Sequence, residues 1–296
     1  MQATDTLLMI RPSRFRFNQQ TAATNIFQNE NAADEKTAMN EFNNFVSLLR
    51  ENEIEVLQFE EEKNSDTPDC VFPNNWLMTF EKNIFLFPML AANRREERRT
   101  DIIKALQEKF QFNIQDELLS FEKEEKYLEG TGALVLDRKN KIAYCNLSSR
   151  CNEEVIDKFC AATGFSAIKF SAHTPDGSEI YHTNVLMCIG NSVAVICDEW
   201  IRSVTERELV LNSLKKNHTV ISLSSEQVFA FAGNMLLVKN KSGKYFWVMS
   251  TRAFNSLTEN QKVILKTDGE IIHVNINTIE SLGGGSARCM LAEIFH

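Results

Sequence analysis

The carboxyl end of the chain combines three consecutive glycines with a single thiol. Gly283, Gly284 and Gly285 precede Cys289 in a protein of 296 residues that holds only 11 glycines. Glycine is used where the backbone must take a positive φ or come close to a ligand, so this run predicts a tight turn that delivers Cys289 into a pocket. The alternative is a plain turn before a buried strand over residues 288–295, with Cys289 as a small core residue.

Three further polar side chains, Asp69, Glu129 and His182, stand at the starts of predicted strand pairs. A thiolate is a soft nucleophile, and an imidazole can donate a proton to a leaving amine and then activate water. Two carboxylates would raise the pKa of a nearby thiol unless a cation lay between them. A planar guanidinium is such a cation, and its forked N–H donors match carboxylate oxygens. The four groups therefore indicate attack by Cys289 on a guanidinium carbon.

Each of these residues also has an ordinary structural interpretation. Asp69 follows a proline and could be a turn residue, Glu129 could cap a helix or pair with a surface lysine, and His182 could be a hydrogen-bonded core histidine. Their equivalent positions in successive repeats favour the functional interpretation. The other four histidines are interpreted as structural, at positions 173, 218, 273 and 296.

The elements that must position these groups repeat about every 55 residues. Amphipathic helices are predicted over residues 36–52, 94–110, 152–163, 205–217 and 257–265. Short strands are expected after four of them, over residues 54–59, 167–171, 219–223 and 271–276, with a gap at 112–119. Longer strand pairs are predicted over residues 70–89, 132–147, 184–197 and 228–250, and a fifth pair joins residues 288–295 to residues 6–11.

This pattern predicts an α/β fold, specifically a five-bladed α/β propeller built from pseudo-fivefold ββαβ-type repeats around a central channel. The starts of the strand pairs would face that channel. Residues 1–296 are expected to form a single domain, because no linker rich in Pro, Gly or Ser interrupts the series. The alternative is an ordinary mixed α/β fold whose spacing happens to be regular.

Composition excludes several classes of partner. The net charge is −8 and the densest basic run, residues 94–99, is broken by Glu96 and Glu97, so no nucleic-acid partner is expected. Seven cysteines without a CxxC pair argue for a reducing compartment, the cytoplasm, and against a disulfide frame or structural zinc. The first thirty residues lack the apolar core of a signal peptide and no stretch resembles a membrane span, so no membrane partner is expected either.

Several motifs along nearly the whole chain carry a family resemblance. They are Met9-Ile-Arg-Pro, Pro68-Asp69, Phe72-Pro-Asn-Asn-Trp76, Asn93-Arg-Arg-Glu-Glu-Arg98, Leu128-Glu129-Gly-Thr-Gly132, His182-Thr-Asn184 and the terminal Gly-Gly-Gly-Ser-Ala-Arg-Cys289-Met. Together they resemble the guanidine-modifying pentein superfamily of arginine deiminases, dimethylarginine dimethylaminohydrolases and amidinotransferases. Within it the resemblance is strongest to the citrulline-utilization hydrolase branch, which is related to the arginine deiminases.

The resemblance implies a role for each site residue. Cys289 would be the nucleophile, His182 the general acid and base, and Glu129 the carboxylate beside the histidine and the guanidinium. Asp69 would anchor the guanidinium, and the substrate-binding residues would be completed by Asn75, Asn184 and Arg288. No metal and no cofactor is implied. Related hydrolases place an acidic residue near Asn75, and arginine deiminases carry Asp where this chain has Asn184, so fewer negative groups would hold the cation.

The function expected from these residues and this resemblance is hydrolysis of a C–N bond in a small cationic guanidino substrate. Arginine or an arginine derivative would give citrulline and ammonia or an amine through an S-amidino intermediate on Cys289. Two alternatives stay open: an amidinotransferase that uses the same intermediate, and a noncatalytic binding protein on the same fold. A papain-like protease is disfavoured, because that scheme needs the thiol before the histidine in the chain.

Overall fold

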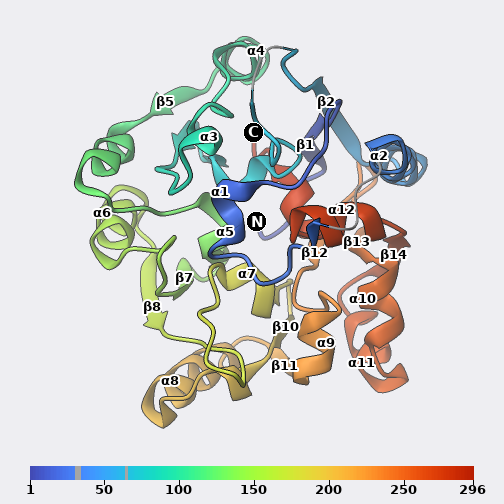
Figure 1. Ribbon diagram of the computed structural model, residues 1–296. Helices are drawn as coiled ribbons and strands as arrows, with labels where there is room; N and C mark the ends of the chain where they lie inside the picture. The colour runs from blue at the N-terminus through green and yellow to red at the C-terminus, as the bar shows by residue number, and fades with distance from the viewer. Residues whose placement is uncertain (31–34, 64–65) are drawn as a thin grey trace.

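The computed structural model describes residues 1–30, 35–63 and 66–296, and the strands of this part of the chain form five three-stranded sheets (Figure 1). Every sheet has the same plan, in which an antiparallel pair is followed by a third strand that lies parallel to the second. Five sheets of one plan are consistent with five repeats in an α/β fold.

The strands of the first sheet are β15 (Ala292–Glu293), β1 (Thr6–Arg11) and β2 (Glu55–Glu60). The other four sheets follow chain order. The second consists of β3 (Leu77–Phe80), β4 (Asn83–Leu86) and β5 (Asn113–Gln115), and the third of β6 (Leu134–Asp137), β7 (Ile142–Asn146) and β8 (Ser166–Phe170). The fourth consists of β9 (Met187–Ile189), β10 (Val193–Ile196) and β11 (Thr219–Ser222), and the fifth of β12 (Leu236–Lys239), β13 (Tyr245–Ser250) and β14 (Glu270–Val274).

A helical crossover joins the second strand of each sheet to the third, because two parallel neighbours cannot be joined by a tight turn. Figure 1 shows these crossover helices at the outside of the molecule. They are α2 (Glu35–Glu51), α4 (Thr100–Phe110), α6 (Glu153–Thr163), α8 (Val204–Lys215) and the pair α10 (Thr251–Ser256) and α11 (Glu259–Leu265). The predictions for α2, α6 and α8 are confirmed to within two residues at each end.

Short helical turns stand ahead of the antiparallel pairs and lie toward the middle of the molecule (Figure 1). Four of them are η2 (Pro73–Asn75), α5 (Gly130–Ala133), α7 (Thr183–Leu186) and η5 (Ala287–Met290). α5 contacts both η2 and α7, and η2 contacts η5. The predicted strand pairs therefore begin later than expected, because their first residues form these turns. The other helices are α1 (Gln19–Ala22), α3 (Ala92–Arg95), η3 (Glu117–Glu124), η4 (Asp198–Trp200), α9 (Ser225–Phe229) and α12 (Asn277–Gly283).

Three further predictions need correction. The helix expected over residues 94–110 is divided into α3 and α4, and the segment between them carries Glu97, which is buried and binds Arg94 of α3. The helix expected over 257–265 begins only at Glu259, where Thr258 forms a capping box. The gap at 112–119 contains β5, which lies parallel to β4.

The predicted pairing of the two ends of the chain is confirmed, although it is shorter than expected. Leu7 and Leu8 of β1 pair antiparallel with Glu293 and Ala292 of β15. Residues 287–290 form η5 rather than strand, so the strand predicted over 288–295 shrinks to Ala292–Glu293.

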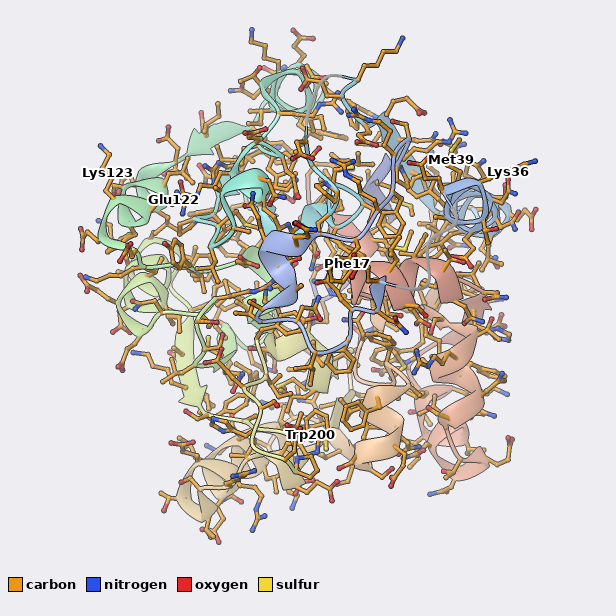
Figure 2. The ribbon with its side chains drawn as sticks, in the orientation of Figure 1. Phe17, Lys36, Met39, Glu122, Lys123 and Trp200 are labelled. Atoms are coloured by element: carbon orange, nitrogen blue, oxygen red, sulfur yellow. The ribbon has the colours of Figure 1, made fainter. Side chains whose placement is uncertain are left out.

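The segment after β1 crosses the face that Figure 1 presents, and α1 lies near its middle. In Figure 2, Phe17 of this segment is seen near the centre of the face, whereas Glu122 and Lys123 lie at one rim and Lys36 and Met39 at the opposite rim. None of the helices in the described ranges has the length and the apolar character that crossing a membrane requires.

Candidate active site

One buried pocket is lined by two of the three predicted catalytic residues, His182 and Cys289, and by the predicted guanidinium anchor Asp69. Asp69 comes from the turn before η2, His182 directly precedes α7, and Cys289 lies within η5. Glu129 directly precedes α5 and lies behind His182. The short turns between neighbouring sheets are therefore the elements that bring these distant residues together.

His182 and Glu129 form a close pair. Nε2 of His182 lies 2.8 Å from Oε2 of Glu129, and Oε1 of the same carboxylate accepts a hydrogen bond from the backbone N–H of Leu90 at 3.1 Å. Burial acts to raise the pKa of Glu129, but the charges of Arg150 and Arg94 and the bond with His182 outweigh it and lower that pKa to about 2. Glu129 is therefore an anion throughout the physiological range.

His182 has the opposite protonation state. Burial lowers the pKa of His182 to about 4, although the neighbouring Glu129 acts to raise it. At neutral pH the imidazole is uncharged, and the ionised carboxylate accepts the proton of Nε2. Nδ1 is then the ring nitrogen that can accept a proton, which is the property a general base needs.

Steric constraints explain why two positions of the Leu-Glu-Gly-Thr-Gly motif are glycine. A Cβ placed on Gly132 would lie 2.7 Å from Nδ1 and 2.8 Å from Cε1 of His182, so only glycine permits this approach. Gly130 has a φ of +44°, and a Cβ there would meet the backbone oxygen of Asn74 at 2.5 Å. The two glycines allow α5 to pack against η2 and the histidine.

Cys289 lies between two carboxamides. Asn184 Nδ2 is 3.6 Å from its Sγ and Asn234 Nδ2 is 3.3 Å away. Burial raises the pKa of the Cys289 thiol, while the hydrogen bonds with Asn234 and with the backbone of Ser286, together with the charge of Arg288, act to lower it. The sulfur is thus a buried thiol with donors already directed at it.

The glycine run forms part of the same pocket. Gly283, Gly284 and Gly285 line it, and Gly284 ends α12 with a φ of +64° in the left-handed region. The hydroxyl of Tyr181 donates to the backbone oxygen of Gly284 at 2.7 Å. The prediction of a tight glycine turn that delivers Cys289 into a pocket is confirmed in its geometry.

The two carboxylate oxygens of Asp69 differ in their hydrogen bonding. Its Oδ2 accepts hydrogen bonds from Asn18 Nδ2 at 2.8 Å and from Thr21 Oγ1 at 3.1 Å. Its Oδ1 is buried and has no hydrogen-bond partner among the described residues. Burial raises the pKa of Asp69 and Arg94 opposes that shift. An unsatisfied carboxylate oxygen in a buried pocket favours a ligand that donates hydrogen bonds.

Arg94 was not singled out by the sequence analysis, although it lies in one of the quoted motifs. Its guanidinium binds Glu97 through two hydrogen bonds of 2.9 Å and donates from Nη1 to Asn75 Oδ1 at 2.7 Å. It also lies 4.0 Å from Asp69 and 3.9 Å from Glu129. Asn75 lines the pocket as expected, but its oxygen faces Arg94, and its Nδ2 has no hydrogen-bond partner in the described ranges.

Arg150 is a second arginine that the sequence analysis missed. It lines the pocket, its Nη1 lies 3.5 Å from Glu129 Oε2, and its guanidinium lies over the ring of Tyr181 at 4.7 Å. Nη2 donates to the backbone oxygen of Thr21 at 3.1 Å. The positive charge that the sequence analysis required near the carboxylates is thus supplied in part by the chain itself.

Two of the predicted substrate-binding residues do not line this pocket. Asn184 lies behind the sulfur of Cys289, and Arg288 is directed into a separate cavity, where it binds Glu293. Any contact of these two residues with substrate stays a prediction. In residues 1–30, 35–63 and 66–296, no group of three or more His, Cys, Asp or Glu side chains is placed to hold a metal ion.

Comparison with known proteins identifies a family that the sequence matches. The family model for N,N dimethylarginine dimethylhydrolase, eukaryotic, matches residues 11–296. No curated protein sequence matches the chain.

Solved structures show the same fold at low sequence identity. The N-terminal domain of ArgZ, an arginine dihydrolase from the ornithine-ammonia cycle in cyanobacteria, in a mutant form bound to substrate, is 14% identical with a TM-score of 0.77, and the match covers 98% of each chain. For the apo structure of ArgZ the TM-score is 0.78, and this chain, matched over 98% of its length, spans only 40% of that protein. A dimethylarginine dimethylaminohydrolase in an adduct with S-methyl-L-thiocitrulline is 13% identical over 99% of this chain and 100% of the other, with a TM-score of 0.69.

Proposed function

The chain belongs to the N,N-dimethylarginine dimethylhydrolase family, and from this premise we propose that it hydrolyses a C–N bond of a guanidino compound. The substrate would be arginine or an arginine derivative, and the products citrulline and ammonia or an amine. The observation that carries the proposal is the pocket in which a thiol, a neutral imidazole held by an ionised carboxylate, and an open carboxylate oxygen meet.

Substrate binding would activate the nucleophile. Oδ1 of Asp69 is the acceptor available to a guanidinium N–H, and this charge-assisted hydrogen bond would hold the planar group in the pocket. The positive charge of the bound substrate would lower the pKa of Cys289, which burial raises in the unliganded protein. The thiolate would then form only when its target is in place.

The covalent step would use Cys289 and His182, which line the same pocket. The sulfur forms a bond to the guanidinium carbon while its proton passes to Nδ1 of His182, and the imidazolium returns that proton to the leaving nitrogen as the C–N bond breaks. Water then adds to the S-amidino carbon, again giving a proton to His182. As the C–S bond breaks and the new C=O forms, the thiolate takes back the proton held by His182, and the hydroxyl proton of the adduct passes through water to the released ammonia or amine. Glu129 would stabilise the imidazolium in both halves.

The arginines of the pocket support an amino-acid substrate over a simple alkylguanidine. Among the described residues, the side chain of Arg150 donates hydrogen bonds to Thr21 and Thr24, and its guanidinium shares Glu129 with His182 and Arg94. The carboxylate of arginine would be a further anion for this guanidinium, whereas agmatine would enter as a dication without that partner. This contact would select for the α-carboxylate.

The pocket is closed in this structure, so substrate entry requires movement. Its volume is about 20 Å³, room for about one water molecule and too little for arginine. The segment with α1 covers it, since Asn18 and Thr21 bind Asp69 and Asn25 Nδ2 donates to Gly283 O at 3.2 Å. We propose that residues 18–25 open to admit substrate.

We also propose the overall architecture of the chain. The five sheets and the pairing of β15 with β1 support a closed five-bladed propeller, formed by residues 1–296 as one domain, with the short turns around its channel. A cytoplasmic location stays a prediction.

A substrate screen tests the function. Arginine, methylated arginines, agmatine and related guanidines are incubated with wild type, Cys289→Ala and the control Cys160→Ala, and the ureido product and released amine are measured. We expect turnover of at least one guanidino amino acid by wild type and Cys160→Ala only, with an adduct on Cys289 by intact-mass analysis. Turnover that needs an added amine would identify a transferase. Binding without turnover in wild type would identify a noncatalytic protein.

A further inference from the structure

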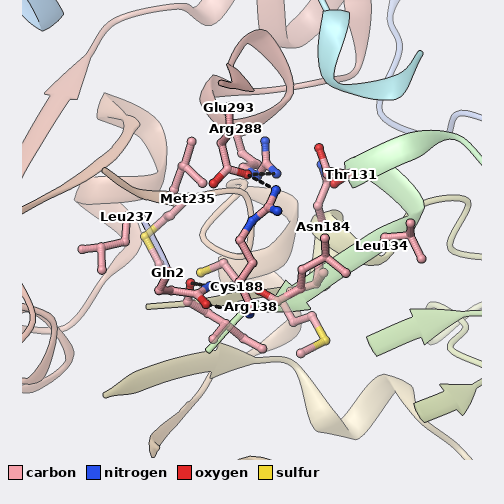
Figure 3. A pocket seen from close by; sticks show the side chains of 15 residues that line it. Gln2, Thr131, Leu134, Arg138, Asn184, Cys188, Met235, Leu237, Arg288 and Glu293 are labelled. Atoms are coloured by element: carbon pink, nitrogen blue, oxygen red, sulfur yellow. Dashed lines mark hydrogen bonds and ion pairs between the residues drawn. The ribbon is translucent and has the colours of Figure 1, made fainter. Parts of the chain in front are cut away.

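A second cavity, shown in Figure 3, has Asn184 in its lining. Its volume is about 30 Å³, enough for one or two water-sized spheres. Asn184 Nδ2 also lies 3.6 Å from the sulfur of Cys289, so this side chain connects the cavity with the nucleophile. The proposed hydrolytic reaction assigns no role to this space.

Three charged side chains line the cavity, and their charges do not cancel. Arg288 Nη2 donates to Glu293 Oε2 at 3.0 Å, while Arg138 Nη2 lies 3.8 Å from the same oxygen. Figure 3 shows both guanidinium groups reaching this one carboxylate. Each of the three residues is at most 8% exposed. Two buried cations thus share a single anion, which leaves one positive charge uncompensated.

Arg138 carries the open donor. Its Nη2 has no hydrogen-bond partner among the described residues, and Nη1 reaches only the backbone oxygen of Thr79 at 3.5 Å. Gln2 fixes the backbone beside it, since Gln2 Oε1 accepts from the N–H of Arg138 at 2.8 Å and Gln2 Nε2 donates to Leu136 O at 2.9 Å. The guanidinium of Arg138 also lies over the ring of Phe295 at 4.1 Å, and the contacts with this ring and with Thr79 hold the open N–H group in place.

The apolar walls of the cavity make the uncompensated positive charge energetically unfavourable. They include the side chains of Leu134, Leu136, Met187, Ile189, Met235 and Leu237. Burial lowers the pKa of Arg138, with Glu293 opposing and Arg288 adding to that shift. Because an arginine keeps its charge in proteins, a site of this kind favours an added anion over loss of the proton.

We propose that this cavity binds one small monovalent anion of the chloride class, held by Arg138 Nη2 and by the joint charge of Arg138 and Arg288. The volume excludes a phosphate ester or an amino acid. A single negative charge brings the group of three side chains to neutrality.

The anion would also act on the nucleophile. The charge of Arg288 lowers the pKa of Cys289. An anion beside Arg288 offsets that charge, so the thiolate fraction of Cys289 falls when the cavity is occupied. The site thus couples the anion content of the solution to the reactivity of a thiol that Asn184 contacts.

Binding is tested without any substrate. The melting temperature is measured in chloride and in gluconate at the same ionic strength, and crystals containing bromide are examined for anomalous density beside Arg138 Nη2. We expect a higher melting temperature in chloride and bromide density at that atom. Arg138→Gln is expected to lose both effects, and Lys139→Gln, the same charge change at an exposed neighbour, to keep them. Arg138→Lys, which keeps the charge, serves if the Gln variant does not fold.

The coupling is tested by alkylation. The rate at which iodoacetamide modifies the Cys289 peptide is expected to be roughly threefold lower in chloride than in gluconate in wild type and Lys139→Gln, and equal in Arg138→Gln. Equal melting temperatures in the two salts together with no bromide density would overturn the site. Bromide density with equal alkylation rates would overturn the coupling to Cys289. Neither readout depends on the proposed hydrolysis.

Discussion

Nε2 of His182 lies 2.8 Å from Oε2 of Glu129, and both side chains are almost completely buried. The pair consists of a neutral imidazole and an ionised carboxylate, because burial lowers the pKa of His182 to about 4 while Arg150 and Arg94 outweigh the effect of burial on Glu129. This arrangement fixes the tautomer of the histidine, with the proton on Nε2 and the lone pair on Nδ1.

The Glu129→Gln variant tests how much the carboxylate of Glu129 contributes to catalysis through His182. The amide can no longer stabilise an imidazolium, so we expect kcat to fall by roughly 10² to 10⁴, the range of a general acid–base contribution, with a smaller change in KM. Steady-state kinetics with the guanidino substrate found in the screen measure both parameters. Glu179→Gln, which changes an exposed carboxylate bound to Ser149, is the control and keeps wild-type kcat. An unchanged kcat in Glu129→Gln would remove Glu129 from the mechanism.

The same pKa values predict how stability depends on pH. The unfolded chain protonates His182 near 6.5, whereas the folded chain does so only near 4, so the unfolded state gains protons first as the pH falls. The free energy of unfolding should therefore decrease from pH 6.5 down to pH 4, by on the order of 3 kcal/mol from this one group. Glu129 adds to the loss below pH 4.5, as its folded pKa is about 2. Urea denaturation at several pH values measures the slope. His182→Asn is expected to have a shallower slope between pH 6.5 and 4, and an identical slope would contradict the prediction.

Gly132→Ala tests the close packing behind the histidine. The new Cβ would lie 2.7 Å from Nδ1 of His182 and would force the ring away from its position. Because reaction rates are sensitive to misplacement of a catalytic group by about 1 Å, we expect activity to fall at least 10²-fold. Gly243→Ala is the matched control: its Cβ meets nothing within 4 Å, although its φ of +86° makes alanine strained. It should lose about 1 kcal/mol of stability and no activity. Comparable activity in the two variants would show that the ring does not need this position.

Asn234→Ala tests the donors around the sulfur. Asn234 Nδ2 lies 3.3 Å from Cys289 Sγ, and its hydrogen bond lowers the pKa of the thiol. Removing it should raise that pKa and slow alkylation of Cys289 by roughly tenfold, the effect of losing one hydrogen bond to a charged group. The rate is followed by iodoacetamide labelling across pH 6 to 10. Asn140→Ala, at the exposed turn of the β6–β7 hairpin, is the control. A labelling profile in Asn234→Ala equal to that of wild type would show that the amide does not act on the sulfur.

The repeating pattern of the sequence predicts more of the fold than of the site. Hydrophobic periodicity identifies α2, α6 and α8 because each is a long crossover with one buried face. It fails at η2, α5, α7 and η5, where a single helical turn is too short to show a period. Those turns are held by tertiary contacts such as the approach of Gly132 to His182, which no local pattern reports.

The residues that the sequence analysis missed share a physical reason. Arg94 and Arg150 look like surface charges in sequence, and only the packing shows that both are buried against carboxylates. Asn234 had one available signal, since it stands just before β12, at the start of the strand pair for which no polar candidate was named. The family resemblance implied that Arg288 binds substrate; in the structure its side chain binds Glu293 at the second cavity, and its contact with substrate stays a prediction.

The pairing of Leu7 with Glu293 has a consequence for how the protein is made. β1 is synthesised early, but its edge that pairs with β15 has no partner strand until residues 292–293 have been made. The turn η5, which carries the sulfur of Cys289, is synthesised just before them. Contacts between such distant parts of a chain form slowly, and an uncovered strand edge invites association with other chains. A nascent chain stalled before residue 292 should therefore depend on chaperones more strongly than one that has passed this point.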